Sequence, residues 1–303
     1  MHKVCVAATQ TSLTWNLEEN LEKTEALVRE AAGKGAQIIL LSELFETPYF
    51  CIQPDEKFFE LAKPAEENAA IKRFTAIAKE LEVVLPISFY EKSGRARYNS
   101  IAIIDADGTN LGIYRKTHIP DSPGYFEKFF FNPGDTGFKV WKTRYATIGV
   151  GICWDQWFPE TARCMAVMGA ELLFFPTAIG TEPQDPDLKS TDHWHATQCG
   201  HAAANVMPVI ASNRFGKETY QNILGKDPKD DDLQITFYGS SFIANEHGQM
   251  VEKAKEDEQT VLVHTFDLDD IEKTRTSWGL FRDRRPERYM PLMTSDGIHP
   301  FKQ

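Results

Sequence analysis

The opening segment of the chain alternates between strand-like and helix-like hydrophobic patterns, and this alternation restricts the fold more than any other feature. Residues 4–8 form a short apolar run, residues 17–31 repeat apolar side chains at helical spacing, and residues 37–42 form a second apolar run of strand length. Asn16 is placed to cap the helix, with a glutamate at the capping-box position. A strand–helix–strand unit of this kind holds its two strands parallel, joined by a right-handed crossover.

The same alternation continues along the chain and indicates an α/β protein. The turn "DADGTN" predicts a hairpin between residues 101–104 and 111–114, so antiparallel strands are mixed with parallel ones. Further helices are expected at residues 68–81, 159–168 and 192–206. Between and after them lie apolar runs such as "ELLFFP" and "PVIASN", which have the length of buried strands. Layers of helices covering mixed sheets are therefore the expected architecture.

No change of composition marks a domain boundary, and 303 residues with 42% hydrophobic content can build one large core. We therefore expect a single domain over residues 1–303. The tail over residues 277–303 is charged and aromatic and lacks the periodicity of a core element. Its aromatic residues, Trp278, Phe281 and Tyr289, favour a tail that docks onto another surface, which we expect to belong to a second subunit.

Charge and hydropathy exclude several classes of function. The net charge of −11, without a long cluster of lysine and arginine, argues against a nucleic-acid partner and favours a cationic small molecule. The longest apolar runs, such as residues 38–41 and 172–175, are far below the roughly 18 to 20 residues that span a bilayer, so no membrane partner is expected. No export signal is visible, and the five cysteines include no close-spaced pair, so a cytoplasmic location is expected.

Three chemically distinct side chains follow three of the predicted strands. Glu43 follows "IILLS", Lys116 follows "LGIY", and Cys153 follows the alternating run "IGVGI". In α/β folds the ligand site forms beyond the strand ends, where loops converge. Taken singly, each residue also suits a structural role, as a solvated strand-end charge, a surface lysine or a buried thiol. Together they are the carboxylate, ammonium and thiol that thiol-based amide hydrolysis needs.

This chemistry predicts a separate task for each group. Glu43 is expected to take the thiol proton, and Lys116 to lower the pKa of the thiol and stabilise an oxyanion together with the backbone N–H of Trp154. Pro159 suits the first turn of a helix. We therefore expect Cys153 to lie near a helix N-terminus, whose amides favour negative charge.

The segments "LSELFETPYF", "YRKTHIPDSPGYFEKFFF" and "GICWDQWFPETAR" resemble the three signature segments of the nitrilase, or carbon–nitrogen hydrolase, superfamily, and the resemblance extends along the whole chain. It implies a catalytic triad of Glu43, Lys116 and Cys153, with a second glutamate at Glu127 that helps to place the lysine. It also implies a four-layer αββα sandwich with two mixed β-sheets. Subunits are expected to pair into a homodimer or a larger homo-oligomer built from dimers.

Three further strings, "FPTAIGTEPQDP", "GHAAANVMPVIASNRFG" and "SWGLFRDRRPERY", are similar to the branch of that superfamily that hydrolyses N-carbamoylputrescine. The resemblance implies release of putrescine, carbon dioxide and ammonia through a carbamoyl thioester on the cysteine, a reaction of polyamine biosynthesis. Another nitrilase-type amidase, such as a ureidopropionase or an ω-amidase, is the alternative. No cofactor is expected for any of these reactions.

A substrate with a distal ammonium needs an acidic partner about one extended four-carbon chain from the sulfur. Glu182, on the loop after "FFPTAIG", is the favoured partner. Tyr49 and Trp154 are expected to form apolar or cation–π walls. The full set of expected substrate-binding residues is Tyr49, Asp121, Trp154, Asp155, Ala178 and Glu182.

Two other classes of function compete with this interpretation. The string "DHWHATQCGH" brings His193, His195, Cys199 and His201 close together at a spacing that metal ligands use, as in a metallohydrolase. The sequence contains no H-E-x-x-H and no CxxC, and we expect no metal. A non-catalytic small-molecule-binding protein is the other possibility, and such a protein would tolerate alkylation of its thiols.

Overall fold

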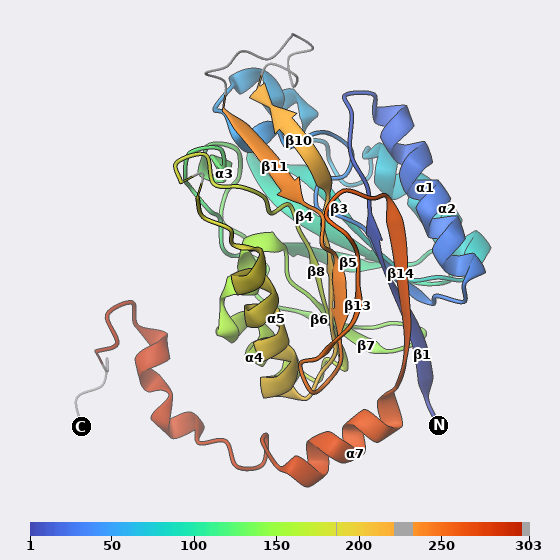
Figure 1. Cartoon of the computed structure of the whole chain (residues 1–303), viewed down its shortest axis with the longest axis vertical. Helices are drawn as coiled ribbons and strands as arrows, with labels where there is room; N and C mark the ends of the chain where they lie inside the picture. The colour runs from blue at the N-terminus through green and yellow to red at the C-terminus, as the bar shows by residue number, and fades with distance from the viewer. Residues whose placement is uncertain (186, 221–232, 299–303) are drawn as a thin grey trace.

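The computed structural model describes residues 1–185, 187–220 and 233–298. Two layers of β-sheet are packed between two layers of helices (Figure 1). The outer layers are α1 (Leu17–Gly33) with α2 (Ala69–Leu81) on one side and α4 (Pro159–Val167) with α5 (Thr191–Asn205) on the other. This arrangement confirms the expected four-layer αββα sandwich with mixed sheets.

The first sheet contains the predicted strand–helix–strand unit. Strand β1 (Lys3–Gln10) pairs in parallel with β2 (Ile38–Leu40) and antiparallel with β14 (Thr260–Asp267). A bridge from Ile38 to Val84 connects this group to an antiparallel meander. The strands of the meander, which includes the predicted hairpin, are β3 (Leu85–Ser93), β4 (Ala96–Ile104) and β5 (Asn110–Arg115).

The second sheet has six strands in the order β13-β12-β9-β8-β7-β6. Its centre, β7 to β9, is parallel, and its edges are antiparallel. In chain order the strands are β6 (Val140–Lys142), β7 (Thr147–Val150), β8 (Leu172–Pro176), β9 (Val209–Ser212), β12 (Phe242–Ala244) and β13 (Met250–Lys253). A separate antiparallel ribbon is formed by β10 (Phe215–Thr219) and β11 (Gln234–Tyr238).

The hydrophobic core lies in three layers because the central strands are apolar on both faces. Strand β1 contributes Val6 to the cluster between the sheets and Ala7 to the cluster beneath α1 and α2. Strand β8 contributes Phe174 to the cluster between the sheets and Phe175 to the cluster beneath α4 and α5. The strand ends are thereby held rigidly, which is the condition for placing side chains at a site between loops.

The two helices of the first layer begin at asparagine caps, one of which, Asn16, was predicted. The Asn16 side chain accepts the Glu19 N–H at 3.3 Å to start α1, and the Asn68 side chain accepts the Ile71 N–H at 2.9 Å to start α2. Pro159 occupies the first turn of α4. Cys153 begins a separate short 3₁₀ helix, η3 (Cys153–Trp157), so the helix N-terminus at which it lies belongs to η3 and not to the helix begun by Pro159.

The helices of the described ranges are short. The longest, α1, has 17 residues and carries glutamates in its first turn. None of the helices in those ranges is long and apolar enough to cross a membrane. The cytoplasmic location stays a prediction.

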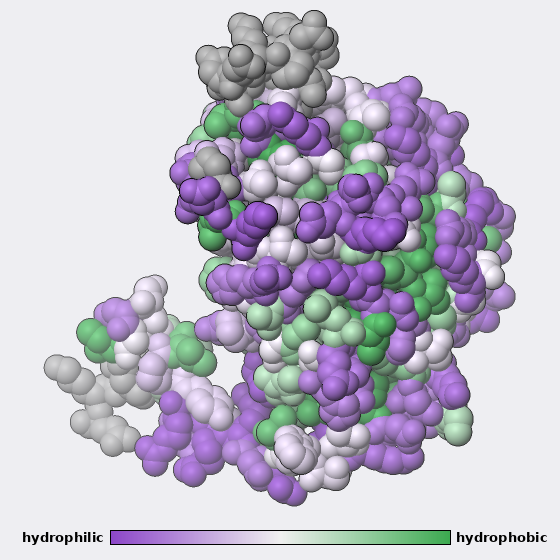
Figure 2. Space-filling view, in the orientation of Figure 1, coloured by the Kyte–Doolittle hydropathy of each residue, from purple (hydrophilic) through white to green (hydrophobic). Residues whose placement is uncertain are grey.

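The C-terminal tail leaves the body of the protein after α7 (Leu268–Trp278) and forms an arm that passes α4 and α5 (Figure 1). Hydrophobic side chains on this arm face solvent (Figure 2), among them Leu292 and Met293, and Trp278 at the end of α7 is exposed as well. Docking of the tail onto a second subunit stays a prediction, as does the single domain over residues 1–303. The remaining short elements are η1 (Phe50–Ile52), η2 (Glu56–Leu61), α3 (Glu127–Phe130), η4 (Pro286–Arg288) and η5 (Met290–Met293).

Candidate active site

The three strand-end residues singled out in the sequence come together in the structure. Glu43 follows β2, Lys116 follows β5, and Cys153 follows β7. The Lys116 ammonium lies 3.0 Å from Oε1 of Glu43 and 2.6 Å from Oε2 of Glu127. The charges of these three groups all act on the pKa of the Cys153 thiol, and all four side chains are buried. The structure therefore places a thiol, two carboxylates and an ammonium in one buried cluster.

Glu43 has one occupied and one open carboxylate oxygen. Its Oε1 accepts the Lys116 ammonium at 3.0 Å and the Asn99 side-chain N–H at 2.7 Å. Its Oε2 is buried and has no hydrogen-bond partner among the described residues. A buried carboxylate oxygen without a partner is costly to keep, and it is free to accept a proton from a group placed beside it.

Lys116 remains an ammonium although it is fully buried. Burial alone would lower the pKa of Lys116, but the nearby carboxylates of Glu127 and Glu43 outweigh it and hold the pKa well above its usual value. Glu127 is itself fixed by Tyr49, whose hydroxyl donates to Oε1 at 2.7 Å. Burial, opposed by Lys116, raises the pKa of Glu127 to about 6. The site thus keeps a fixed positive charge next to the thiol at neutral pH.

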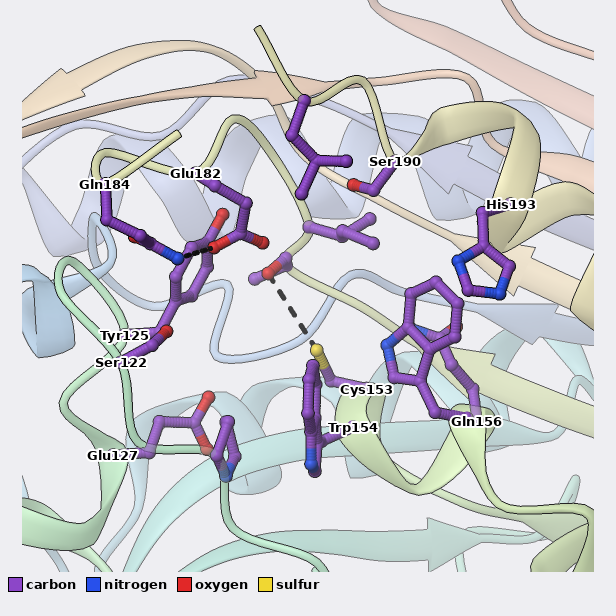
Figure 3. Close-up of a pocket in the computed structure, with 15 residues that line it drawn as sticks. Ser122, Tyr125, Glu127, Cys153, Trp154, Gln156, Glu182, Gln184, Ser190 and His193 are labelled. Atoms are coloured by element: carbon purple, nitrogen blue, oxygen red, sulfur yellow. Dashed lines mark hydrogen bonds between the residues drawn. The ribbon is translucent and has the colours of Figure 1, made fainter. Parts of the chain in front are cut away.

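Cys153 occupies a strained turn at the end of β7. Its φ of 42° lies in the left-handed region that residues with a side chain rarely adopt. Gly151 lets the chain approach the neighbouring strand, since a Cβ there would lie 2.6 Å from the Phe175 ring. The turn directs the thiol towards the carbonyl of Ala178, to which Sγ donates a hydrogen bond at 3.8 Å (Figure 3).

The electrostatics of the free thiol are dominated by burial. Burial raises the pKa of Cys153 well above its usual value, Glu43 raises it further, and Lys116 offsets only part of this effect. Lys116 therefore lowers the thiol pKa as expected, but burial and Glu43 outweigh it. The resting group is a thiol, and it must lose its proton as the sulfur reacts.

Several residues that support the site were not predicted from the sequence. Arg214 is fully buried and donates from Nη2 to the backbone carbonyls of Glu43 and Leu44, at 2.7 and 3.2 Å. It pairs with Glu218, which accepts the Tyr49 N–H at 2.5 Å. The sign in the sequence was an arginine directly after the predicted strand "PVIASN". Asn99 offered no comparable sign, because it lies inside a strand and its partner Glu43 is remote in sequence.

A cavity of about 490 Å³ opens beside the thiol (Figure 3). Three of the predicted substrate-binding residues, Trp154, Ala178 and Glu182, line it, together with Trp157 and Leu188. Glu182 and Cys153 lie on different walls of this cavity, and Glu127 lies at its base. The cavity therefore combines a reactive thiol, an acidic side chain and apolar walls.

The other three predicted substrate-binding residues do not line this pocket. Tyr49 is buried behind it, where its hydroxyl holds Glu127, so it supports the site and is not a wall. Asp121 is exposed to solvent outside the lining. Asp155 is fully buried, and both of its oxygens are occupied by His118, Tyr114 and Ile152. The expectation that Asp155 or Asp121 contacts a ligand in the pocket is not supported by their positions.

Two histidines of helix α5 contact backbone carbonyls and are not arranged as metal ligands. The Nε2 atom of His195 lies 3.1 Å from the Ser240 carbonyl, and that of His201 lies 2.7 Å from the Gln156 carbonyl. Within the described ranges, no group of histidine, cysteine and acidic side chains could hold a metal ion. His193 lines the pocket next to Trp157.

Known proteins resemble this chain in sequence and in fold. The carbon-nitrogen hydrolase family model matches residues 5–276. The chain is 57% identical to an N-carbamoylputrescine amidase of Oryza sativa subsp. japonica, over 97% of this chain and 96% of the relative, and 50% identical to a citrullinase of Francisella tularensis, over 95% and 98%. A carbon-nitrogen hydrolase structure from Helicobacter pylori superimposes with a TM-score of 0.88 at 36% identity, covering 97% of this chain and 99% of that one. The chain therefore belongs to the carbon–nitrogen hydrolase family and is an amidohydrolase.

Proposed function

We propose that this amidohydrolase hydrolyses N-carbamoylputrescine to putrescine, carbon dioxide and ammonia. The observation that carries the proposal is the 57% identity to an N-carbamoylputrescine amidase over nearly the whole of both chains. The pocket supports it, because an acidic side chain, Glu182, shares a cavity with the thiol of Cys153. A ureido group at the thiol and an ammonium at Glu182 are the two ends of this substrate.

In the first half of the proposed reaction, Sγ of Cys153 attacks the ureido carbon while the thiol proton passes to the open Oε2 of Glu43. The Lys116 ammonium stabilises the negative charge that develops on the carbonyl oxygen. The tetrahedral intermediate then breaks its bond to the putrescine nitrogen, which takes the proton from Glu43. Putrescine leaves, and a carbamoyl thioester remains on Cys153.

In the second half, water attacks the thioester carbon and gives a proton to Glu43. The second tetrahedral intermediate collapses, its C–S bond breaks, and the sulfur of Cys153 recovers the proton. The released carbamate decomposes to carbon dioxide and ammonia. Glu127 contributes by holding Lys116 at 2.6 Å, so that the ammonium points to the same place in both halves.

The proposed ammonium partner is Glu182. Burial raises the pKa of Glu182, and its Oε2 accepts only the Gln184 side-chain N–H, at 3.0 Å, among the described contacts. A cation that entered the pocket would offset this unpaired, half-buried charge. The exposed faces of Trp154 and Leu188 offer apolar surface to the methylene chain. No lysine or arginine lines the described part of the pocket, which disfavours the carboxylate-bearing substrates of ureidopropionases and ω-amidases.

The substrate assignment is tested by comparing three ureido compounds as substrates of the purified protein. We expect kcat/KM for N-carbamoylputrescine to exceed that for N-carbamoyl-β-alanine by about 10²-fold or more, because a carboxylate beside Glu182 costs several kcal/mol. Citrulline, which carries both an ammonium and a carboxylate, is the third compound. Release of ammonia is the measurement. Equal or better turnover of either carboxylate-bearing compound would contradict the assignment.

Glu182→Gln is expected to raise KM for N-carbamoylputrescine by about 10-fold to 10²-fold with little change in kcat. The reason is that a charged hydrogen bond contributes about 1.5–3 kcal/mol and the amide keeps the shape of the side chain. Asp121→Asn is the matched control, since it removes the same charge from an exposed residue outside the pocket lining. An unchanged KM in Glu182→Gln would place the ammonium contact elsewhere.

A further inference from the structure

Asp155 lies directly after the cysteine turn, yet it faces away from the pocket into the protein. It is fully buried. Its Oδ1 accepts the backbone N–H of His118 at 3.0 Å and lies 2.7 Å from Nδ1 of the same residue. Its Oδ2 accepts the Tyr114 hydroxyl at 2.8 Å and the Ile152 N–H at 3.0 Å. Both oxygens are therefore saturated by protein groups, and none of the carboxylate remains for a ligand.

Two of these partners stand on either side of Lys116. Tyr114 precedes the lysine at the end of β5, and His118 follows it in the next loop. The Tyr114 hydroxyl also accepts the N–H of Thr117, at 3.2 Å. The segment that carries Lys116 is thus attached before and after the lysine to a single carboxylate.

The same carboxylate is attached to the turn that carries Cys153. Besides the Ile152 N–H that Asp155 accepts through Oδ2, the N–H of Asp155 donates to the Ile152 carbonyl at 3.0 Å. Cys153 sits inside this reciprocal pair with a φ of 42°. A residue with a side chain persists in that conformation only where its surroundings hold it. The bonds across the turn supply this restraint.

The His118 ring extends the connection to the following helix. It stacks on Phe158, with ring centroids 3.6 Å apart and planes 7° from parallel. Phe158 is the residue that caps α4. The lysine loop, the cysteine turn and the start of α4 therefore meet at Asp155.

From these contacts we infer that Asp155 is a positioning residue, which fixes the Lys116 ammonium against the Cys153 sulfur by holding both segments through one carboxylate. The inference rests on the proposed roles of Cys153 and Lys116. A carboxylate is needed at this position because both of its oxygens accept hydrogen bonds. An asparagine would replace one oxygen by an N–H₂ group, which would face either the donors of His118 or the donors of Tyr114 and Ile152. Asp155 does not line the pocket, so its effect on the reaction passes through the residues it holds.

Asp155→Asn is the direct test. We expect kcat for N-carbamoylputrescine to fall by about 10²-fold, as a displacement on the order of 1 Å between reacting groups can cause, while KM stays close to the wild-type value. The rate of Cys153 alkylation by iodoacetamide, followed by peptide mass spectrometry, should shift to higher pH. This shift is expected because Lys116 lowers the thiol pKa less once it is displaced. The exposed Cys164 in the same molecule is the internal reference for reagent and pH.

Two companion variants keep the test decisive. Tyr114→Phe removes one of the hydroxyl contacts and should move kcat and the alkylation profile in the same direction by a smaller amount, even if Asp155→Asn does not fold. Asn68→Ala removes the cap of α2 and should lower thermal stability without moving the alkylation profile of Cys153. A loss of kcat without any alkylation shift in Asp155→Asn and Tyr114→Phe would reduce Asp155 to a purely structural residue and overturn the inference.

A change in KM alone would also overturn it, because that result would make Asp155 a substrate contact. The alkylation readout needs no natural substrate. If the wild-type protein fails to hydrolyse N-carbamoylputrescine, the proposed function fails, while the pH profile of Cys153 in the variants still decides the positioning role.

Discussion

Cys153→Ser is expected to lower kcat for N-carbamoylputrescine by about 10⁴-fold or more while the protein stays folded, a loss of the size seen when a catalytic nucleophile is removed. Burial raises the pKa of the native thiol, and in the proposed mechanism Glu43 takes the thiol proton during attack. A serine hydroxyl in the same buried turn is far less acidic than a thiol and a poorer nucleophile. Ammonia release and thermal unfolding are the two measurements.

The control for this substitution is Cys164→Ser, which makes the same change at an exposed thiol on α4 and should leave turnover unchanged. Iodoacetamide should inactivate the wild-type enzyme, with protection by substrate, and should fail to modify the serine variant at position 153. Normal turnover in Cys153→Ser would remove the nucleophile assignment. Full activity of the alkylated wild-type protein would likewise remove it, whereas a non-catalytic binding protein would release no ammonia even before alkylation.

The elements that could be predicted from the sequence are those controlled by local patterns. Asn16 and Asn68 are helix caps that act within a few residues of themselves, and both helices begin where these caps place them. Glu43, Lys116 and Cys153 were recognisable because each follows an apolar run, and strand ends in layered α/β folds converge.

The features that escaped prediction depend on partners remote in sequence. Asp155 sits beside the cysteine and looked suited to a substrate ammonium, but its oxygens are taken by residues 114 and 118, which reach it only after the two sheets pack together. The net pKa of the thiol could not be predicted for the same reason. The lowering of the thiol pKa by Lys116 could be inferred from the residue types alone. The burial that outweighs it arises only in the folded core.

Two buried residues that take no part in the proposed reaction, Asp155 and Arg214, hold the turns that carry the reactive groups. Arg214 holds the backbone of Glu43 and Leu44, and Leu44 has a φ of 46°, so a second strained turn is restrained by a buried side chain. Cys153 and Glu43 thus both lie at turns with a left-handed residue, one held by Asp155 and the other by Arg214. Backbone strain of this kind stays where surrounding contacts over-determine it.

Glu43→Gln carries the other large expected effect, a decrease of kcat by about 10² to 10⁴-fold, which is the usual contribution of a positioned general base. The amide is nearly the same shape, and its oxygen can still accept from Lys116 and Asn99 as Oε1 does now. The open oxygen is lost, and with it the group that takes the thiol proton and activates water in the proposed mechanism. Lys116 keeps its ion pair with Glu127, and we expect the fold to survive.

The matched control for this change is Glu46→Gln, which makes the same substitution at a carboxylate on the same loop that accepts the Asn68 side chain. Burial raises the pKa of Glu46. The charge of Glu43 acts on the Cys153 thiol, whereas Glu46 bonds to the residue that caps α2. We expect Glu46→Gln to keep wild-type kcat. In Glu43→Gln, any carbamoyl thioester that does form should accumulate, because its hydrolysis needs the same base, and intact-protein mass spectrometry should detect it. Turnover at the wild-type rate in Glu43→Gln would mean that another group moves the proton, and it would assign Glu43 to the placement of Lys116 alone.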